Sequence, residues 1–432
     1  MSPLTLTDSN GNTTHTKAES KGTNGLKGTN GTISSPPSPF RILLRSLEDL
    51  ERESFSNDAE RIEALHAAYA LVSRLETPWE TIARLCMGQP ALGASLKVAK
   101  DVGLFEKWHA QDDGPRGVKE LSEMVGVESL LLERILRHLS SNHVLSEPSP
   151  GLYQQTHFSL SLNTPSFGEW INYLYDATIP CFHKMPEYLA KTGYKNPNDE
   201  HDGIFQYTTG FKGGLFQYYD ANPDKGNTFN YVMSGVMATQ ASWLDIFPHQ
   251  RFVEENSCPK CSPAADKDAA ILVDVGGNVG HDLERFREAH PEVANKLVLQ
   301  DRPDVVKNST LPDPVVKMGH DFFTEQPVKG ARAYYMHGVL HDWSDESCIK
   351  ILEQLRPAMR PGHSTLLVHE HVIPETHPNP HATAYDLTMM VKVAGLERTE
   401  TMWKKLLDTA GFKIVKIWRS PMAAQSVIEA EV

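Results

Sequence analysis

One histidine and two glutamates at the ends of apolar segments are the residues of this sequence best suited to acid–base chemistry. His341 stands in VLHDWSDES, where an apolar run ends in His, Asp and Trp. Glu370 closes the apolar run of STLLVHE, and Glu397 lies in GLERTE. Histidine has an unperturbed pKa of about 6.5, so it accepts a proton near neutral pH. A phenol, with a pKa of about 10, needs such a base before its oxygen becomes a good nucleophile.

Each of these residues also has a purely structural interpretation. His341 alone is as compatible with a structural role at a strand end as with catalysis, and a single buried glutamate is more often a hydrogen-bonded strand-end carboxylate. A carboxylate beside a histidine, however, orients the ring and stabilises the imidazolium that forms. The three residues together therefore favour a catalytic base, His341, held by Glu370 and Glu397.

The triplet His369-Glu370-His371 is a poor metal site. Side chains alternate along a strand, so His369 and His371 are predicted on one face and Glu370 on the other. The sequence therefore predicts chemistry that requires no metal. The CxxC of Cys258 and Cys261 has no second ligand pair nearby and lies in a polar, Pro-rich segment, which predicts an incidental loop pair.

A glycine-containing loop, ILVDVGGNVGHD, runs from a predicted strand into a predicted helix. Gly276 and Gly277 let the backbone approach a ligand, and Asp301, which ends the next strand, is placed to accept hydrogen bonds from two ribose hydroxyls. Both features suit NAD and S-adenosylmethionine. The dinucleotide pattern G-x-G-x-x-G, however, has Asn278 and His281 at its second and third glycine positions, which favours a ligand without a pyrophosphate. Asn278 is the non-glycine type that best tolerates a left-handed backbone.

The elements that must position these residues are short apolar strands that alternate with helices from residue 270 onward. This alternation predicts a mostly parallel sheet covered by helices on both faces, whose ligands bind beyond the carboxyl ends of the strands. The predicted strands are ILVDVG, KLVLQD, RAYYMHGVL, STLLVHE, FKIVKIW and QSVIEAE.

The upstream half is predicted to be helical from about residue 41, following a Ser/Thr/Asn/Gly-rich disordered tail over residues 1–39. Residues 117–147 predict a helix, a Gly-containing turn and a second helix, and residues 152–162 a short hairpin, which together make a winged helix. The second helix is leucine-rich and carries Glu128 and Glu133, which would repel phosphate. We therefore expect it to bind a protein partner rather than DNA.

The composition excludes several classes of function. The formal net charge of −13 argues against a nucleic-acid partner, and no apolar run approaches the roughly 18 residues of a membrane helix. The first residues lack the apolar region of a secretory signal. Five cysteines, an odd and sparse set, fit a reducing compartment, so we expect a cytoplasmic protein.

Six segments in order resemble the class I S-adenosylmethionine-dependent O-methyltransferases of the caffeic-acid and fungal polyketide type. They are LVDVGGNVGHD, VLQDRPDVV, GHDFFTEQP, GVLHDWSDESCIKIL, VHEHVIPE and GLERTETMWKKLLDTAGF. The resemblance implies an α/β fold, a Rossmann-like methyltransferase sheet with an N-terminal helical winged-helix dimerisation domain, and a homodimer. The predicted boundaries are 1–39 for the tail, 40–180 for the dimerisation domain and 181–432 for the cofactor-binding catalytic domain.

The resemblance also implies roles for individual residues. His341 matches the general base, with Glu370 and Glu397 as its flanking carboxylates, and Asp342 would approach the methionine portion of the cofactor. His337 stands where a Lys or Arg usually contacts the cofactor. The other implied cofactor contacts are Gly276, Gly277, Asp301, Asp321 and Phe322, and the implied acceptor-pocket residues are Phe182, Met389 and Met390.

The predicted function is O-methylation of a phenolic or enolic group on an aromatic or polyketide-like small molecule. Some fungal relatives of this fold are pericyclases that keep the cofactor without methyl transfer, and in one of them the pair matching His341 and Asp342 reads Arg-Asp. LETPWETIARL resembles the equivalent helix of that enzyme, which keeps a pericyclase or dehydratase as an alternative. A silent DNA-binding regulator and a nicotinamide dehydrogenase are further alternatives, disfavoured by the acidic helix and by the missing glycine.

Overall fold

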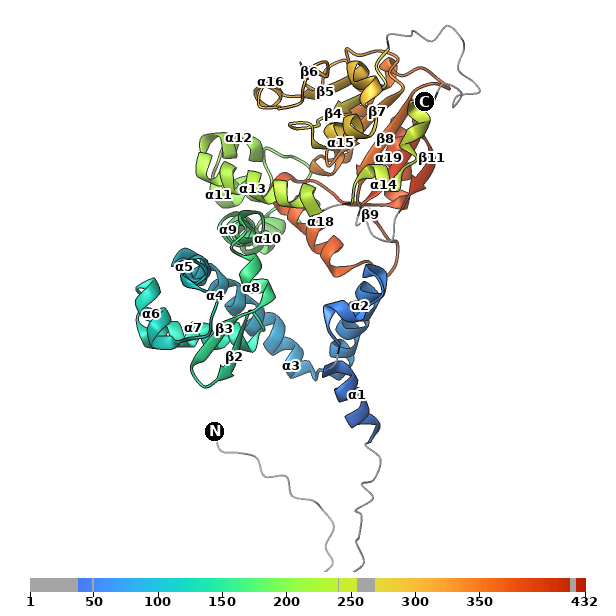
Figure 1. Ribbon diagram of the computed structural model, residues 1–432. Coiled ribbons are helices and arrows are strands. Elements are labelled where there is room, and N and C mark those ends of the chain that lie inside the picture. The colour runs from blue at the N-terminus through green and yellow to red at the C-terminus, as the bar shows by residue number, and fades with distance from the viewer. Residues whose placement is uncertain (1–37, 49, 240, 255–268, 420–424) are drawn as a thin grey trace, which may run out of the picture. The chain divides into compact units, whose positions relative to one another are not determined.

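A computed structural model describes residues 38–48, 50–239, 241–254, 269–419 and 425–432 (Figure 1). Cys258 and Cys261 and most of the predicted tail lie outside these residues. The chain divides into two compact units after Arg61. The boundaries at residues 39 and 180 stay predictions.

Helices follow one another from residue 39, as the apolar periodicity predicts. They are α1 (Pro39–Glu48), the short η1 (Arg52–Ser54), α2 (Asp58–Leu75), α3 (Pro78–Ile82) and the π-helical η2 (Ala83–Gly88). Thr77 begins α3 with a capping box, in which its hydroxyl accepts the Glu80 N–H and the Glu80 carboxylate accepts the Thr77 N–H.

The segment from residue 89 to 161 is mostly helical, and the two consecutive helices within residues 118–141 are followed by a hairpin; that they form a winged helix stays a prediction. Its elements are α4 (Gln89–Asp101), α5 (Leu104–Gln111), β1 (Arg116–Gly117), α6 (Val118–Val125), α7 (Ser129–Ser141), β2 (Leu145–Ser149), β3 (Leu152–Gln155) and α8 (His157–Ser161). The hairpin predicted over residues 152–162 was misplaced, because it spans residues 145–155. Thr156 and Ser159 form a capping box that starts α8 where the second strand was predicted.

Seven strands form the main sheet among the described residues, in the order β11-β12-β8-β7-β4-β5-β6. The pairs from β8 to β6 are parallel, and β12 and β11 close one edge antiparallel. The strand β6 was missed in the sequence because it is short and mixes Lys with apolar residues. The strands are β4 (Leu272–Val275), β5 (Leu297–Asp301), β6 (Val316–Gly319), β7 (Ala333–His337), β8 (Thr365–Glu370), β11 (Lys413–Trp418) and β12 (Ser426–Glu431).

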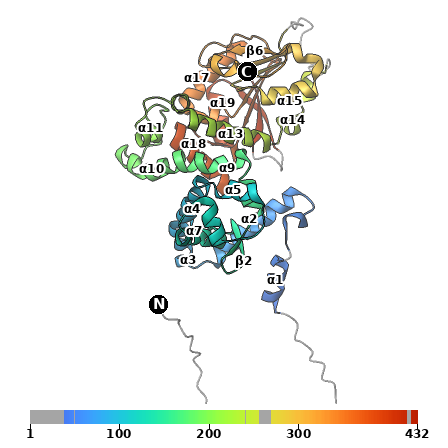
Figure 2. The ribbon, with the colours of Figure 1, turned by 60° about the vertical axis from the view of Figure 1, so that its left-hand side comes forward.

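Alternate side chains of these strands enter two separate cores, one on each face of the sheet. In β4, Val273 and Val275 pack in the core that contains Trp403, whereas Leu272 packs in the core that contains Trp243. Figure 2 shows α17 and α19 on one side of the strands and α14 and α15 on the other. The covering helices are α14 (Trp243–Ile246), η4 (His249–Phe252), α15 (His281–Ala289), η5 (Pro291–Lys296), α16 (Pro303–Val306), α17 (Asp345–Leu355), η7 (Arg356–Ala358) and α19 (Glu400–Thr409).

A further helical cluster is formed by the helices between residues 165 and 239 together with one helix from the C-terminal third of the chain, α18. Its apolar core combines residues such as Tyr173, Phe205, Tyr219 and Met389. We call it the aromatic cluster. Its helices are α9 (Pro165–Tyr173), η3 (Leu174–Thr178), α10 (Ile179–Lys191), α11 (Ile204–Thr209), α12 (Leu215–Ala221), α13 (Pro223–Thr239) and α18 (Pro380–Val393).

Candidate active site

The turn after β7 presents His341 and is held by one buried carboxylate. The strand ends at His337, and η6 (Leu340–Asp342) follows. Glu370, at the end of the neighbouring strand β8, accepts hydrogen bonds through Oε1 from the backbone N–H groups of Val339, Leu340 and His341, at 3.0, 2.9 and 3.3 Å. Glu370 is fully buried, and through these three hydrogen bonds it fixes the turn that carries the histidine.

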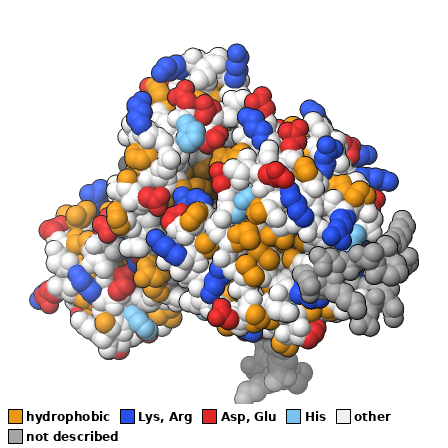
Figure 3. All heavy atoms as spheres, turned by 90° about the horizontal axis from the view of Figure 1, so that it is seen from above, with side chains coloured by type: hydrophobic (Ala, Val, Ile, Leu, Met, Phe, Trp, Pro, Cys, Tyr) orange, Lys and Arg blue, Asp and Glu red, His pale blue; other side chains and the backbone are white. Residues whose placement is uncertain are grey.

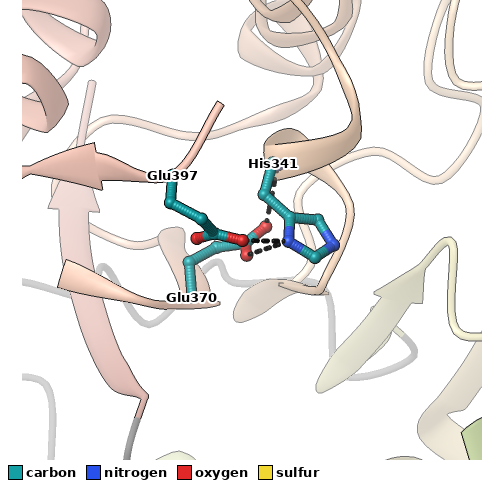
Figure 4. Close-up of side chains that lie close together, drawn as sticks. All are labelled: His341, Glu370 and Glu397. Carbon is teal, nitrogen blue, oxygen red and sulfur yellow. Dashed lines mark hydrogen bonds and ion pairs between the residues drawn. The ribbon is translucent and has the colours of Figure 1, made fainter. Parts of the chain in front are cut away.

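The second glutamate contacts the histidine ring itself. Glu397 Oε1 lies 2.6 Å from His341 Nδ1, and Glu370 Oε2 lies 3.8 Å from the same nitrogen (Figure 4). Glu397 is positioned in turn by Asp386 of α18, whose Oδ1 accepts the Glu397 N–H at 2.8 Å. The three residues that the sequence singled out therefore do come together, and with Nδ1 engaged, Nε2 is the ring nitrogen left for an acceptor.

Burial and charge act in opposite directions on the imidazole. Burial alone lowers the pKa of His341, but the carboxylates of Glu370, Glu397 and Asp342 together raise it well above its usual value. Burial raises the pKa of Glu370, while the imidazolium holds the pKa of Glu397 below its usual value despite burial. Burial also raises the pKa of Asp342 to about 6. The resting site therefore favours an imidazolium paired with the Glu397 carboxylate.

Two further residues that the sequence did not single out complete this side of the site. Tyr385 of α18 stacks near His341, with ring centroids 6.0 Å apart. Arg398, fully buried, donates to the carbonyls of Leu340 and Trp343 at 3.0 and 2.9 Å and so clamps η6 from the other side. Arg398 directly follows Glu397 in the sequence, and an arginine next to a candidate catalytic glutamate was the feature from which this role could have been predicted.

The strand alternation predicted for His369 and Glu370 is correct, but His371 behaves differently. His369 points to the opposite face of the sheet, where its Nδ1 lies 2.8 Å from the Tyr335 hydroxyl. The strand ends at Glu370, so the alternation stops there, and His371 packs 5.3 Å from the Tyr385 ring on the same side as the site.

Ligand atoms of His341, Glu370 and Glu397 lie within 4.8 Å of one another, a spacing that a metal ion could use. The hydrogen bond at 2.6 Å between Glu397 and Nδ1, however, uses the nitrogen that would have to bind the ion. This contact favours an acid–base role for the three residues.

The glycine loop has the backbone that the sequence predicts. Gly276 has φ of +75°, and a Cβ there would lie 2.8 Å from Val339 Cγ2. Asn278 has φ of +55°, so it does adopt the left-handed conformation. Its N–H donates to Asp301 Oδ2 at 2.8 Å, which joins the loop to the end of β5. Burial raises the pKa of Asp301.

A buried aspartate beneath this loop was missed by the sequence reasoning. Asp274 is 1% exposed, and neither of its carboxylate oxygens has a hydrogen-bond partner among the described residues. A Cβ on Gly277 would lie 2.4 Å from this carboxylate, so only glycine fits above it. Burial raises the pKa of Asp274 well above its usual value. The single carboxylate inside the apolar run ILVDV was the signal that could have identified it.

The other predicted cofactor residues lie around the same strand ends. Phe322 lies 3.7 Å from the position of a Cβ on Gly276 and packs edge-on against Trp343, and the neighbouring Asp321 accepts the Phe323 N–H at 3.0 Å. Asp342 Oδ1 lies 3.6 Å from His341 Nε2.

His337 is held by other side chains of the protein. Its Nδ1 lies 2.5 Å from Asp282 and its Nε2 lies 2.8 Å from Gln425, while its ring stacks on His369 with centroids 4.1 Å apart. Burial lowers the pKa of His337, but Asp282 outweighs burial and the pKa is raised. Both nitrogens are engaged, so a ligand contact through His337 would have to use its ring carbons.

The predicted acceptor residues Phe182, Met389 and Met390 all lie in the aromatic cluster. Tyr385, which stacks near His341, belongs to the same cluster. These three residues therefore share an apolar cluster with a ring that lies beside the histidine, and their role at the acceptor stays a prediction.

Comparisons with known proteins identify the family. Residues 266–413 match a family model described as an O-methyltransferase domain. O-methyltransferase mfmE of Annulohypoxylon moriforme is 59% identical over 403 residues, which cover 93% of this chain and 98% of that protein. The chain therefore belongs to the O-methyltransferase family.

Two solved structures share the fold. LepI, solved in complex with S-adenosylmethionine, matches with a TM-score of 0.77 at 24% identity over 91% of this chain and 98% of its own. OxaC, solved with S-adenosylhomocysteine and oxaline, matches with a TM-score of 0.75 at 23% identity over 91% and 96% of the two chains.

The residues around the glycine loop fit the cofactor of this family, S-adenosylmethionine. Gly276 and Gly277 leave space that side chains would fill, and the unpartnered Asp274 carboxylate suits a cationic group above it. The Asp301 carboxylate at the end of β5 suits hydroxyl donors.

We expect Glu397→Gln to lower the pKa of His341, because it removes the negative charge next to Nδ1 that stabilises the imidazolium. The measurement is an NMR titration of the labelled imidazole. Glu400→Gln, which removes an exposed charge three residues away, should leave the titration of His341 unchanged. Equal pKa values in wild type and Glu397→Gln would contradict this account.

We expect Asp274→Asn to weaken binding of S-adenosylhomocysteine by about tenfold or more and to leave the melting midpoint of the ligand-free protein equal or higher. The carboxylate is unpaired and buried, so neutralising it removes a desolvation cost and also a charge that a cationic ligand group would use. Calorimetric titration and thermal unfolding measure the two effects, with the exposed Asp304→Asn as control. A loss of affinity together with a lower midpoint would indicate damage to the fold instead.

Proposed function

We propose that the chain is an S-adenosylmethionine-dependent O-methyltransferase that acts on a phenolic or enolic hydroxyl of an aromatic or polyketide-like secondary metabolite. The observation that supports this proposal best is the 2.6 Å contact of Glu397 with His341 Nδ1, which leaves Nε2 free of a close partner beside the strand ends that carry the glycine loop. When bound, S-adenosylmethionine supplies the sulfonium methyl group that an acceptor oxygen takes.

In the proposed mechanism, His341 in its neutral form takes the acceptor hydroxyl proton at Nε2. Glu397 then holds the imidazolium that forms, and Glu370 keeps the turn and the ring in place through its three backbone hydrogen bonds. Since the pKa of His341 is raised, the neutral form is scarce at low pH, and the rate should rise with pH until the ring has lost its proton.

The proposed cofactor contacts are residues at and near the strand ends. Asp301 would accept hydrogen bonds from the ribose hydroxyls, and Asp321 and Phe322 would border the adenine. Gly276 and Gly277 would leave room for the methionine portion, Asp274 and Asp342 would hold its ammonium group, and His337 would support this region through Asp282. Phe182, Met389 and Met390 border the acceptor.

A pericyclase or dehydratase that keeps the cofactor without methyl transfer is the second candidate. The fold does not separate the two, because a solved structure described as a pericyclic reaction enzyme matches with a TM-score of 0.78, although the chain belongs to the O-methyltransferase family. The contact between His341 and Glu397 favours methyl transfer, since a buried base held by two carboxylates serves the deprotonation of a hydroxyl.

We expect wild type to transfer labelled methyl from S-adenosylmethionine to at least one member of a phenol panel, with or without EDTA. His341→Ala should lower this rate by about 10²–10⁴-fold, because a positioned base contributes that much, while S-adenosylhomocysteine affinity stays the same. The exposed His157→Ala serves as control. If no acceptor is labelled while a polyketide or pyridone substrate still cyclises, the methyltransferase proposal fails.

We also propose that the protein is a homodimer formed through its N-terminal helices. Between Ile62 and Gly88 these helices expose large apolar side chains, an arrangement typical of a surface that a second copy covers. The exposed side chains are Leu65, Tyr69, Val72, Leu75, Trp79, Ile82, Leu85 and Met87.

The expected partners otherwise are small molecules. Figure 3 shows one face of the molecule, on which acidic and basic side chains are interspersed rather than gathered into a basic field. Within the described part of the chain, every helix falls short of the length and apolarity that crossing a bilayer demands.

We expect light scattering to give twice the chain mass for wild type and a single chain mass for a Leu75→Glu/Trp79→Glu double variant, because burying two carboxylates at the interface is costly. Leu75 and Trp79 are 71% and 69% exposed, so the substitutions should not disturb the fold of one chain. Val415→Glu, at an exposed apolar residue of β11, is the matched control. A monomeric wild type would rule out the dimer.

A further inference from the structure

Lys392 is a buried amine in the aromatic cluster that the mechanism above does not use. It lies near the C-terminus of α18 and is 1% exposed. Its Nζ donates a hydrogen bond to the Tyr219 hydroxyl at 2.9 Å and lies 3.7 Å from the ring centroid of Tyr173. The second ring, Tyr219, lies with its centroid 5.6 Å from Nζ.

No carboxylate balances this amine among the described residues. Burial lowers the pKa of Lys392 to about 7, and the one ionisable group that opposes burial is the Cys181 thiol. An ammonium group has three donors, and the structure gives it one hydrogen-bond acceptor and one aromatic face. Two donors therefore lack a hydrogen-bond acceptor, and a buried cation without a counter-ion is costly.

The neighbouring hydroxyls add further donors at the same place. Burial raises the pKa of Tyr173 and of Tyr219, so both phenols stay protonated at any working pH. The amine thus lies between the Tyr219 hydroxyl and the Tyr173 ring, in apolar surroundings that contain Phe229, which stacks on Tyr219 at 4.8 Å. Such a group of donors is suited to an anionic oxygen.

This group of donors lies next to the proposed acceptor site. Met389 and Met390 lie three and two residues before Lys392 on α18, and Tyr385, about two turns earlier on the same helix, stacks near His341. The Asp342 carboxylate, next to His341, contributes to the raised pKa of Tyr173, so the two groups are within electrostatic reach of each other.

We propose that Lys392, together with the hydroxyls of Tyr173 and Tyr219, binds an anionic oxygen of the acceptor, apart from the hydroxyl that His341 deprotonates. The acceptor class is then narrowed to aromatic or polyketide-like molecules that carry a carboxylate or another acidic oxygen. This inference rests on the proposed function, because the anionic group that would pair with Lys392 is taken to be part of the acceptor molecule.

The test compares 2,4-dihydroxybenzoate with its methyl ester, which has the same ring without the anion. Calorimetric titration of the complex with S-adenosylhomocysteine at pH 8 should show at least about a tenfold preference of wild type for the acid. Lys392→Met keeps the side-chain length, removes the charge and should abolish the preference. Lys350→Met, which removes an exposed lysine from α17, should keep it.

A proton count separates this role from a purely structural one. At pH 8 an amine with a pKa of about 7 is mostly neutral, and an anion that binds it draws in a proton. Titrations in buffers of different ionisation enthalpy should therefore show proton uptake with the acid in wild type and none in Lys392→Met.

Folding of the variant is checked by its stability. The pKa of Lys392 is lower in the folded protein than in the unfolded chain, so between about pH 7 and pH 10.5 the unfolded chain binds more protons, and stability increases with pH in that window. Lys392→Met should have a higher melting midpoint than wild type at pH 7. Between about pH 7 and pH 10.5 the midpoint of the variant should not show the increase with pH that wild type shows.

The outcomes separate this inference from the proposed function. No binding of either probe by wild type, equal binding of both, or a preference that survives in Lys392→Met overturns the role of Lys392. Labelled methyl transfer to any phenol is scored independently. A preference for the acid that depends on Lys392, without methyl transfer to any acceptor, would keep the anion site and reject the methyltransferase.

Discussion

The buried carboxylate of Glu370 is the group on which the rest of the site depends. A fully buried carboxylate is costly unless several donors surround it, and three consecutive backbone N–H groups at residues 339–341 supply them. The same contacts determine where β7 ends and in which direction η6 leaves the sheet. His341 is therefore placed by backbone hydrogen bonds to a neighbouring strand, and its ring is free to engage Glu397.

Charge in this region is distributed so that each buried group has a defined partner. The carbonyls of η6 and of the following loop accept hydrogen bonds from Arg398. The imidazole of His341 contacts the Glu397 carboxylate, and the backbone N–H groups of the turn donate hydrogen bonds to Glu370. On the opposite face of the sheet, Asp282 and His337 form a second buried pair that is continued by stacking on His369. Asp274 is the exception among these buried carboxylates, because its oxygens have no hydrogen-bond partner among the described residues. It lies under the glycine loop, where the proposed cofactor would supply a partner.

The methyltransferase sheet by itself supports more than one chemistry. The LepI and OxaC chains match this fold with nearly equal TM-scores. Another solved structure with this fold is described as a pericyclic reaction enzyme. Chemistry is decided by side chains at the strand ends and by the aromatic cluster beside them. In this protein a buried amine, Lys392, lies against the cluster, whose side chains are mostly aromatic and aliphatic. Its helices come from distant parts of the sequence, so the composition of this wall is set by the packing of α9, α12 and α18.

The sequence by itself determined the mostly parallel sheet and the glycine loop, and it singled out His341, Glu370 and Glu397, which the structure brings together. These follow from local rules: strand periodicity, the backbone freedom of Gly276 and Asn278, and the proton affinity of histidine. It misplaced one hairpin, because the capping box at Thr156 resembles a strand in its alternation, and it extended strand alternation to His371, past the end of β8. Only the tertiary structure showed that Glu370 fixes a turn while Glu397 holds the ring, that Asp274 is unpaired, and that Lys392 meets Tyr173 and Tyr219. These contacts join residues far apart in the chain, and burial and pairing depend on which segments pack together, which local sequence does not specify.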